Sequence, residues 1–489
     1  MKIRCIFAIC IVLAATGVSS ANSEEPEYFA MFAEGKKIGH VIRSRVVAGG
    51  NVTTTEEVSL LVGRANEMIR VNTTRTNIET TDGKPLGFKM TQNSGGMSTS
   101  ISGTVDSLWI VDVTAISMGQ KQKKTTGWPS GAVMDEGLRL LELEKGFKEG
   151  LEYNVKIFDP ASVRGIESKI HIGPKQNVDL LGRIVPLTEV KTTFKAPGGG
   201  EIIGTSYVDD NGNIKKTIIP IIGTQHMEMI ACTKEFALGE NDVLELIDKM
   251  FLASPKPLND IESAKSVTYY LKPNNQVTKL MIPSSDNQSV EQKGGEVIVT
   301  VRPIAAPAGV KFPYEGTDNN ALEAMKPTSY VQSDYNDIIS LAKRVVGETK
   351  DAAEAIRKIV SFVSGHIDNR SLSVGYATAA EVAASKAGDC TEFAVLTAAM
   401  CRAVGIPARA VSGLVYMKSF GDRENVFGGH MWVEAYIGGK WVGLDATRAP
   451  KDFDAGHIAL AIGNGEPADF LDLAATLGRF KIDKVTIEK

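Results

Sequence analysis

The chain has 489 residues, 43% of them hydrophobic and 23% charged, and a formal net charge of −4 at pH 7. This is the composition of an ordinary globular protein, long enough for two to four domains with buried cores. Charges of both signs are mixed along the chain, without the basic stripe that binds a nucleic-acid backbone. We therefore expect no nucleic-acid partner.

The first residues are typical of an export signal. Two basic residues precede an apolar run, Ile6–Ala15, which is too short to cross a bilayer as a helix, and small residues follow it. We expect residues 1–21 to be a signal peptide, cleaved after Ser20 or Ala21. The mature protein is then expected to be periplasmic or secreted, with no integral membrane segment.

Three cysteines lie beyond the predicted signal: Cys232, Cys390 and Cys401. So few cysteines argue against a disulfide framework in an exported protein. An odd number leaves at least one thiol unpaired. Cys232 and Cys401 either pair with each other or are both buried free thiols.

The region from Glu24 to about Glu240 is predicted to consist of short strands. Stretches rich in threonine, valine and isoleucine alternate with turn residues, and Asn211-Gly212 is typical of a hairpin turn. This pattern predicts an antiparallel β-rich domain over residues 24–252. Helical spacing of apolar residues predicts a short helix at Leu138–Leu143 and another at Asn241–Leu252.

A proline-containing linker leads to a small β module, expected over residues 259–325. Its predicted strands are Ser266–Leu271, Val277–Ile282 and Glu296–Arg302.

The pattern changes to helices at residue 333. Apolar residues recur at helical spacing, and capping signatures start helices at Asp351 and Thr378. Strands follow the helices, which is typical of an α+β fold. We expect residues 333–489 to form a core in which helices pack on an antiparallel sheet.

The segment around Cys390 has the pattern of a nucleophile site. Asp389 and Glu392 have capping-box spacing, and the apolar residues after them predict a buried helix that begins at Cys390. At a helix start, backbone N–H groups and the helix dipole favour a thiolate and could receive an oxyanion. The alternative is that Cys390 is only a small buried hydrophobic residue.

A base is expected on the hairpin that follows. An alternating strand, the turn Gly438-Gly439 and a returning strand predict a β-hairpin. If the residues beside the turn pair with each other, Asp445 projects on the same side of the hairpin as His430. A carboxylate there would orient the imidazole and stabilise its protonated form.

The sequence resembles the transglutaminase-like superfamily at three separated motifs. They are Gly388–Glu392 running into Arg402–Arg409, then Gly429–Glu434, then Trp441–Thr447. The resemblance covers roughly residues 333–465. It implies Cys390 as nucleophile, His430 as general base and acid, and Asp445 as the residue that orients the base. Members often supply a second oxyanion donor upstream of the cysteine, and Tyr376 is the candidate here.

The resemblance implies an enzyme that forms a thioester at Cys390 with an amide substrate. The export signal makes extracytoplasmic protein or peptide amides the expected substrates. Water would resolve the thioester in a peptidase or amidase, and an amine would do so in a transglutaminase. Hydrolysis is slightly favoured, because amine transfer needs a dedicated second site. The alternative is a non-catalytic extracytoplasmic binding or assembly module on the same scaffold, against which the intact triad argues.

We expect neither a metal site nor a cofactor. The chain lacks the CxxC and HxxxH spacings that zinc sites use, and no helix pattern follows the glycines at 198–200 to cradle a phosphate. The histidines outside the motifs are interpreted as structural: His40, His171, His226, His366 and His457.

Overall fold

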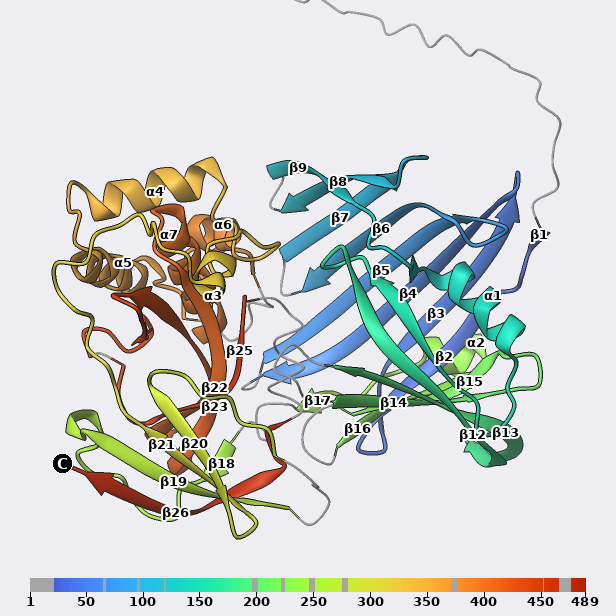
Figure 1. Cartoon of the computed structure of the whole chain (residues 1–489). Coiled ribbons are helices and arrows are strands. Elements are labelled where there is room, and N and C mark those ends of the chain that lie inside the picture. The colour runs from blue at the N-terminus through green and yellow to red at the C-terminus, as the bar shows by residue number, and fades with distance from the viewer. Residues whose placement is uncertain are drawn as a thin grey trace, which may run out of the picture.

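The structure, a computed structural model, describes residues 22–64, 67–94, 97–117, 120–195, 201–220, 225–245, 251–274, 280–370, 377–451, 453–465 and 476–489. Strands hold 52% and helices 17% of the chain, and most helices gather in its C-terminal half (Figure 1). The predicted signal peptide lies outside the described residues. Among the helices that the structure describes, none is long and apolar enough to cross a membrane.

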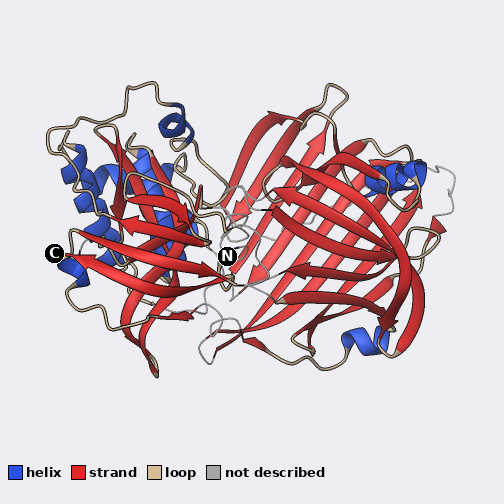
Figure 2. Cartoon of the chain, turned by 60° about the horizontal axis from the view of Figure 1, so that its bottom comes forward, coloured by secondary structure: helices blue, strands red, loops and turns tan. Residues whose placement is uncertain are grey.

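The N-terminal half forms one long sheet of 17 strands, which curls over itself (Figure 2). Consecutive strands pair antiparallel from β2 to β9 and from β11 to β16, and β16 pairs with β2. The predicted antiparallel, β-rich character is confirmed. The strands are β1 (Asn22–Ser23), β2 (Glu27–Ala33), β3 (Lys36–Ala48), β4 (Asn51–Arg64), β5 (Glu67–Thr80), β6 (Pro85–Ser94), β7 (Met97–Val105), β8 (Ile110–Ser117), β9 (Gln120–Gly127), β10 (Ala132–Val133), β11 (Glu152–Asp159), β12 (Arg164–Leu180), β13 (Arg183–Lys195), β14 (Glu201–Val208), β15 (Ile214–Pro220), β16 (His226–Cys232) and β17 (Leu244–Glu245).

Aromatic side chains hold the curl together. The rings of Phe88 on β6 and Trp128 pack on Phe158 of β11, with centroid distances of 4.9 and 4.4 Å. Strands that are distant in the sheet therefore share one buried cluster. The predicted hairpin at Asn211-Gly212 is also confirmed, since β14 and β15 pair on either side of it.

A helix packs against β4 and β5 of this sheet. It is α1 (Asp135–Lys145), and it contains the helix predicted at Leu138–Leu143. The buried Glu79 carboxylate caps its start, accepting hydrogen bonds from the backbone N–H groups of Glu136 and Gly137 at 2.6 and 2.9 Å. The cap thus comes from a neighbouring strand and not from the helix itself.

The helix predicted at Asn241–Leu252 is wrong where the structure describes this segment. Leu244–Glu245 is a strand paired with β4, and Phe251–Ala253 is a strand, β18, paired with residues 426–428. Residues 246–250 lie outside the described residues. Pairing with two distant strands has overridden a helical spacing of apolar side chains.

The C-terminal half contains two antiparallel sheets. The first has β18, β23 (Arg423–Ile437), β22 (Ala408–Phe420) and β25 (His457–Gly463) in that order, with β24 (Lys440–Leu444) also paired to β23. The second has β20 (Gln288–Lys293), β21 (Glu296–Val301), β19 (Ser266–Pro273) and β26 (Phe480–Glu488) in that order.

The second sheet differs from the predicted module in two strands. Residues 280–282 of the expected strand Val277–Ile282 are not in a strand, and residues 275–279 lie outside the described part. Its edge strand is instead the polar β20. The other edge is β26, which belongs to the far end of the chain and pairs with β19.

The helices of this half are α3 (Asn319–Glu323), α4 (Asn336–Val346), α5 (Ala352–His366), α6 (Ala379–Ser385) and α7 (Cys390–Ala403); α2 (Lys234–Leu238) and the short 3₁₀ turn Ile261–Ser263 precede them. The buried helix α7 contacts α4, α5 and α6 as well as β22 and β23. The predicted capping boxes at the starts of α6 and α7 are both confirmed.

Strand β23 is buried on both faces. Met431 and Val433 join the cluster of the helices, whereas Trp432 and Phe427 join the cluster that includes the second sheet. Strands β18 and β24 pair with the same edge of β23 at different positions, so residues 429–432 pair with neither of them. His430 lies in this gap.

Candidate active site

Cys390 is the first residue of α7, and its thiol is half-buried and free. Cys232 and Cys401 are free as well, so they do not pair with each other. Burial raises the pKa of the Cys401 thiol to about 12 and also raises that of Cys232. Both are therefore poor nucleophiles near neutral pH.

The start of α7 is fixed by the residues that flank Cys390. Asp389 accepts a hydrogen bond from the Thr391 N–H at 2.9 Å, and the buried Glu392 carboxylate accepts one from the Asp389 N–H at 2.9 Å. The other Glu392 oxygen accepts from the Ala377 N–H at 2.9 Å, which ties the upstream segment to the helix. A Cβ on Gly388 would lie 2.3 Å from the Glu392 side chain, so glycine is required there.

Burial raises the pKa of Glu392 to about 8, and the charge of Asp389 adds to the effect. Its folded pKa lies above its ordinary value of 4.5, so its contribution to stability is greatest below pH 4.5 and is lost as the pH rises toward 8. We therefore expect Glu392→Gln to flatten the fall in melting temperature between pH 5 and pH 8.5. Thermal unfolding at several pH values measures this.

The exposed Glu348→Gln is the matched control and should keep the wild-type pH dependence. The buried carboxyl of Glu79, whose pKa burial raises to about 7, leaves part of the slope in place. An unchanged slope in Glu392→Gln would contradict the expectation.

His430 and Asp445 come together as the hairpin register predicts. Ile437 pairs with Lys440, which confirms the register beside the turn. His430 Nε2 lies 2.8 Å from Asp445 Oδ2, and both side chains are buried. Asp445 Oδ1 accepts hydrogen bonds from the N–H and the hydroxyl of Thr447 at 2.9 and 2.6 Å.

The His430 ring also has the Cys390 side chain as a hydrogen-bond partner. Because Nε2 faces Asp445, Nδ1 is the ring nitrogen left for the thiol. Burial alone would lower the pKa of His430, but the charge and hydrogen bond of Asp445, together with Cys390, raise it to about 9. Burial would raise the pKa of Asp445, but His430 and His457 hold it well below its usual range. The pair is therefore an imidazolium and a carboxylate at neutral pH.

One residue of this site was missed by the sequence interpretation. His457, assigned there as structural, is buried and places Nε2 3.1 Å from Asp445 Oδ2. Its other nitrogen faces Asp454. No local motif marks His457, because it reaches Asp445 through the pairing of β25 with β22.

His430, Asp445 and His457 bring ring nitrogens and a carboxylate oxygen within 4.8 Å of one another, as a metal site would. However, the oxygen lies 2.8 and 3.1 Å from the two nitrogens, which are hydrogen-bond distances, whereas zinc–ligand bonds are about 2.0–2.2 Å. A hydrogen-bonded cluster accounts for this geometry, and the absence of a metal site stays a prediction.

The remaining candidates are Tyr376 and the histidines outside the motifs. Tyr376, the candidate oxyanion donor, lies outside the described residues. His171 and His226 contact Glu152 and Glu228 on exposed parts of the long sheet, and His366 contacts the Ala383 carbonyl group at 2.8 Å. None of these three histidines contacts the cluster around Cys390.

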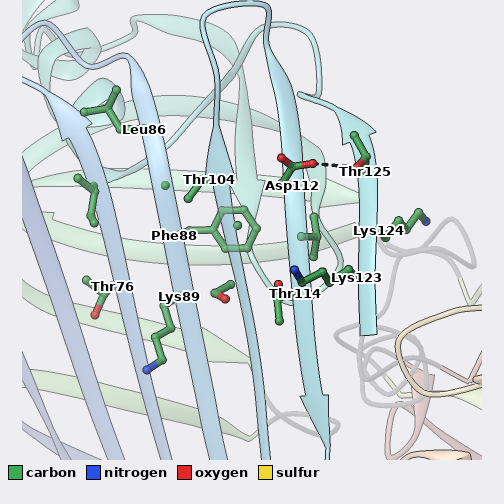
Figure 3. A pocket seen from close by; sticks show the side chains of 15 residues that line it. Thr76, Leu86, Phe88, Lys89, Thr104, Asp112, Thr114, Lys123, Lys124 and Thr125 are labelled. Carbon is green, nitrogen blue, oxygen red and sulfur yellow. Dashed lines mark hydrogen bonds between the residues drawn. The ribbon is translucent and has the colours of Figure 1, made fainter. Parts of the chain in front are cut away.

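A hollow of about 570 Å³ lies on strands β5 to β9 of the long sheet (Figure 3). Threonine and lysine side chains line it, and Asp112 accepts a hydrogen bond from Thr125 there. Its lining contains no cysteine or histidine. A smaller cavity of about 120 Å³ lies where β6–β8 approach Tyr330, Gln332 and Thr378. The long sheet therefore borders the helical region near the start of α6.

Comparison with known proteins confirms the family resemblance. Residues 339–446 match the model of the transglutaminase-like superfamily. An uncharacterised protein of Mycobacterium leprae is 25% identical over 163 residues, which make up 32% of this chain and 54% of that protein. The chain thus spans about half the length of this relative.

Two solved structures are also similar. One, described as a candidate cysteine protease from Cytophaga hutchinsonii, is 20% identical with a TM-score of 0.29, over 49% of this chain and 86% of that one. The other, a β-barrel-like protein of a domain of unknown function from Brucella abortus, is 13% identical with a TM-score of 0.32, over 42% and 95% of the two chains.

Proposed function

We propose that this chain, whose residues 339–446 form a transglutaminase-like domain, is an exported cysteine-dependent enzyme that cleaves protein or peptide amides through a thioester at Cys390. The observation that carries the proposal is the position of His430, which has both the Cys390 thiol and the Asp445 carboxylate as partners. A nucleophile, a base and a group that orients the base are the parts that covalent acyl transfer needs.

The proposed reaction has two steps. The Cys390 thiolate attacks the amide carbonyl carbon, and the backbone N–H groups at the start of α7 face the oxyanion that forms. Protonated His430 then gives its proton to the departing amine, leaving a thioester on sulfur. In the second step neutral His430 takes a proton from water, the resulting hydroxide attacks the thioester, and the carboxylic acid leaves as the thiolate–imidazolium pair reforms.

Export and extracytoplasmic substrates belong to the proposal. The residues that suggest a signal peptide, 1–21, precede the described part of the chain. Resolution of the thioester by an amine would use the same three side chains and make the enzyme a transglutaminase. We favour water, for which no second site is needed.

The test is incubation of the mature protein with a mixture of proteome-derived peptides, with and without the dansyl-labelled amine monodansylcadaverine. Mass spectrometry then separates hydrolysis, which creates new peptide termini or converts side-chain amides to acids, from amine transfer, which adds the dansyl label. Hydroxylamine should intercept the thioester and release a hydroxamate. Absence of all three products from the wild-type protein would refute the proposal.

The rate should depend on pH through His430. The leaving amine needs the proton of the imidazolium, and the pKa of His430 is raised to about 9. We therefore expect kcat/KM to stay high through neutral pH and to fall above about pH 9. A profile measured between pH 6 and pH 10.5 checks this. A fall centred near the ordinary histidine value of 6.5 would mean that Asp445 does not stabilise the imidazolium in the free enzyme.

A further inference from the structure

We infer that His457 is a positioning residue of this site: a protonated ring that holds the Asp445 carboxylate in line with His430. The inference rests on the proposed function, to which it adds a fourth residue and a second acidic partner, Asp454.

The surroundings of the two His457 ring nitrogens show why the ring should be charged. Nε2 lies 3.1 Å from Asp445 Oδ2, and Nδ1 lies 3.0 Å from the Asp454 carbonyl oxygen and 3.2 Å from Asp454 Oδ1. All three partners are acceptors when the carboxylates are ionised. A neutral imidazole has only one N–H, so it would turn a lone pair toward an acceptor, whereas an imidazolium donates from both nitrogens.

Both carboxylates have the partners of ionised groups. Asp445 accepts from His430 and, through Oδ1, from Thr447. Asp454 Oδ2 accepts from Arg448 Nη2 at 2.9 Å, and its Oδ1 accepts from the Gly456 N–H at 2.8 Å. A carboxylate that accepts several hydrogen bonds is stabilised in its charged form. A neutral His457 would therefore face two negative groups in a buried site.

The charges thus alternate along one connected row: His430, Asp445, His457, Asp454 and Arg448. Burial lowers the pKa of His457, but the hydrogen bonds and charges of Asp445 and Asp454 outweigh it and raise that pKa above its usual range. Burial also opposes ionisation of Asp454, whose pKa is nevertheless lowered by His457 and Arg448. Tyr269, whose pKa is raised by burial and by the charge of Asp454, donates to the Ala455 carbonyl group and carries no charge.

The His457 ring has no room to turn. Its side chain is 0% exposed, and its centroid lies 4.5 Å from that of Phe453, 5.1 Å from that of Trp432 and 5.9 Å from that of His430. Thr447 holds Asp445 Oδ1, so Oδ2 is held between the two histidine nitrogens. A fixed Oδ2 in turn fixes Nε2 of His430 and leaves its Nδ1 toward Cys390.

The simpler alternative is a neutral histidine that only fills space between β25 and Trp432. The two interpretations differ in a directly measurable property of the wild-type protein, the number of protons on the His457 ring. Nitrogen-15 NMR of the histidine-labelled protein, with His457 assigned by comparison with a His457 variant, gives that number. We expect both ring nitrogens to be protonated between pH 6 and pH 8. A single protonated nitrogen at pH 6 would overturn the inference.

Two variants test the effect on the nucleophile, with iodoacetamide as the probe. His457→Phe fills the space without a donor, whereas His457→Gln keeps an amide N–H for Asp445. The Cys390 thiol has the His430 ring as its partner, so its alkylation rate at pH 6 reports whether Asp445 still holds that ring in place. We therefore expect Cys390 to alkylate about tenfold more slowly in His457→Phe than in the wild type. His457→Gln should recover most of the rate.

Equal alkylation rates in a folded His457→Phe and the wild type would overturn the inference, and so would a His457→Gln no faster than His457→Phe. If the Phe variant does not fold, the proton count on the wild-type ring decides. A wild-type Cys390 that reacts no faster than Cys232 would instead count against the proposed function. The two failures are therefore distinguishable.

Discussion

Replacing Cys390 by alanine is expected to abolish amide cleavage, with a loss of about 10⁴-fold or more in kcat, the scale on which triad enzymes lose activity without their nucleophile. The reason is chemical: no other thiol contacts His430 among the described residues, so no thioester can form. The variant should fold normally, because Cys390 is only half-buried and the cap of α7 is made by its neighbours. Peptide hydrolysis and hydroxamate release measure the effect.

The matched control is Cys232→Ala. Cys232 is also a half-buried free thiol, but it lies on β16 in the long sheet. This variant should keep wild-type turnover and hydroxamate release. Turnover that survives in Cys390→Ala and disappears in Cys232→Ala would place the reactive thiol in the long N-terminal sheet. That result would refute the proposed site.

The parts of the site that could be predicted are those encoded by neighbouring residues. The start of α7 follows from Asp389 and Glu392, three positions apart, because a capping box is completed within one helical turn. The meeting of His430 with Asp445 follows from the parity of one hairpin, since its register is set by a two-residue turn. In both cases the partners are close in the sequence, so the local pattern contains the geometry.

The parts that could not be predicted depend on pairing between distant segments. His457 reaches Asp445 because β25 lies beside β22, and β26 completes a sheet whose other strands precede it by far in the chain. Phe251–Ala253 has apolar side chains at helical spacing with its neighbours, yet it pairs with β23. Such choices are made by tertiary packing, which no single window of sequence reveals.

The second large effect is expected when His430 or Asp445 is replaced. His430→Ala removes both the base for water and the acid for the amine, and should lower kcat by about 10²- to 10⁴-fold. An exposed histidine of the long sheet supplies the control, His171→Ala, which should be neutral. A His430→Ala enzyme that turns over at the wild-type rate on the same substrate would leave the triad without a role.

Asp445→Asn separates the charge of the carboxylate from its shape. The amide still fills the space beside Thr447, but it no longer stabilises the imidazolium, which is the main reason that the pKa of His430 is raised to about 9 against the effect of burial. Burial is then opposed by Cys390 and no longer by Asp445, so the alkaline fall in kcat/KM should move from about pH 9 to a lower pH. At neutral pH a larger fraction of His430 would be neutral in the variant and the rate would fall, whereas part of the activity should return as the pH is lowered. A pH profile of kcat/KM shows whether the alkaline limb, the fall in rate at high pH, moves. If the rate falls equally at every pH with the limb still near 9, Asp445 acts by holding the ring in place and its charge is not what keeps His430 protonated.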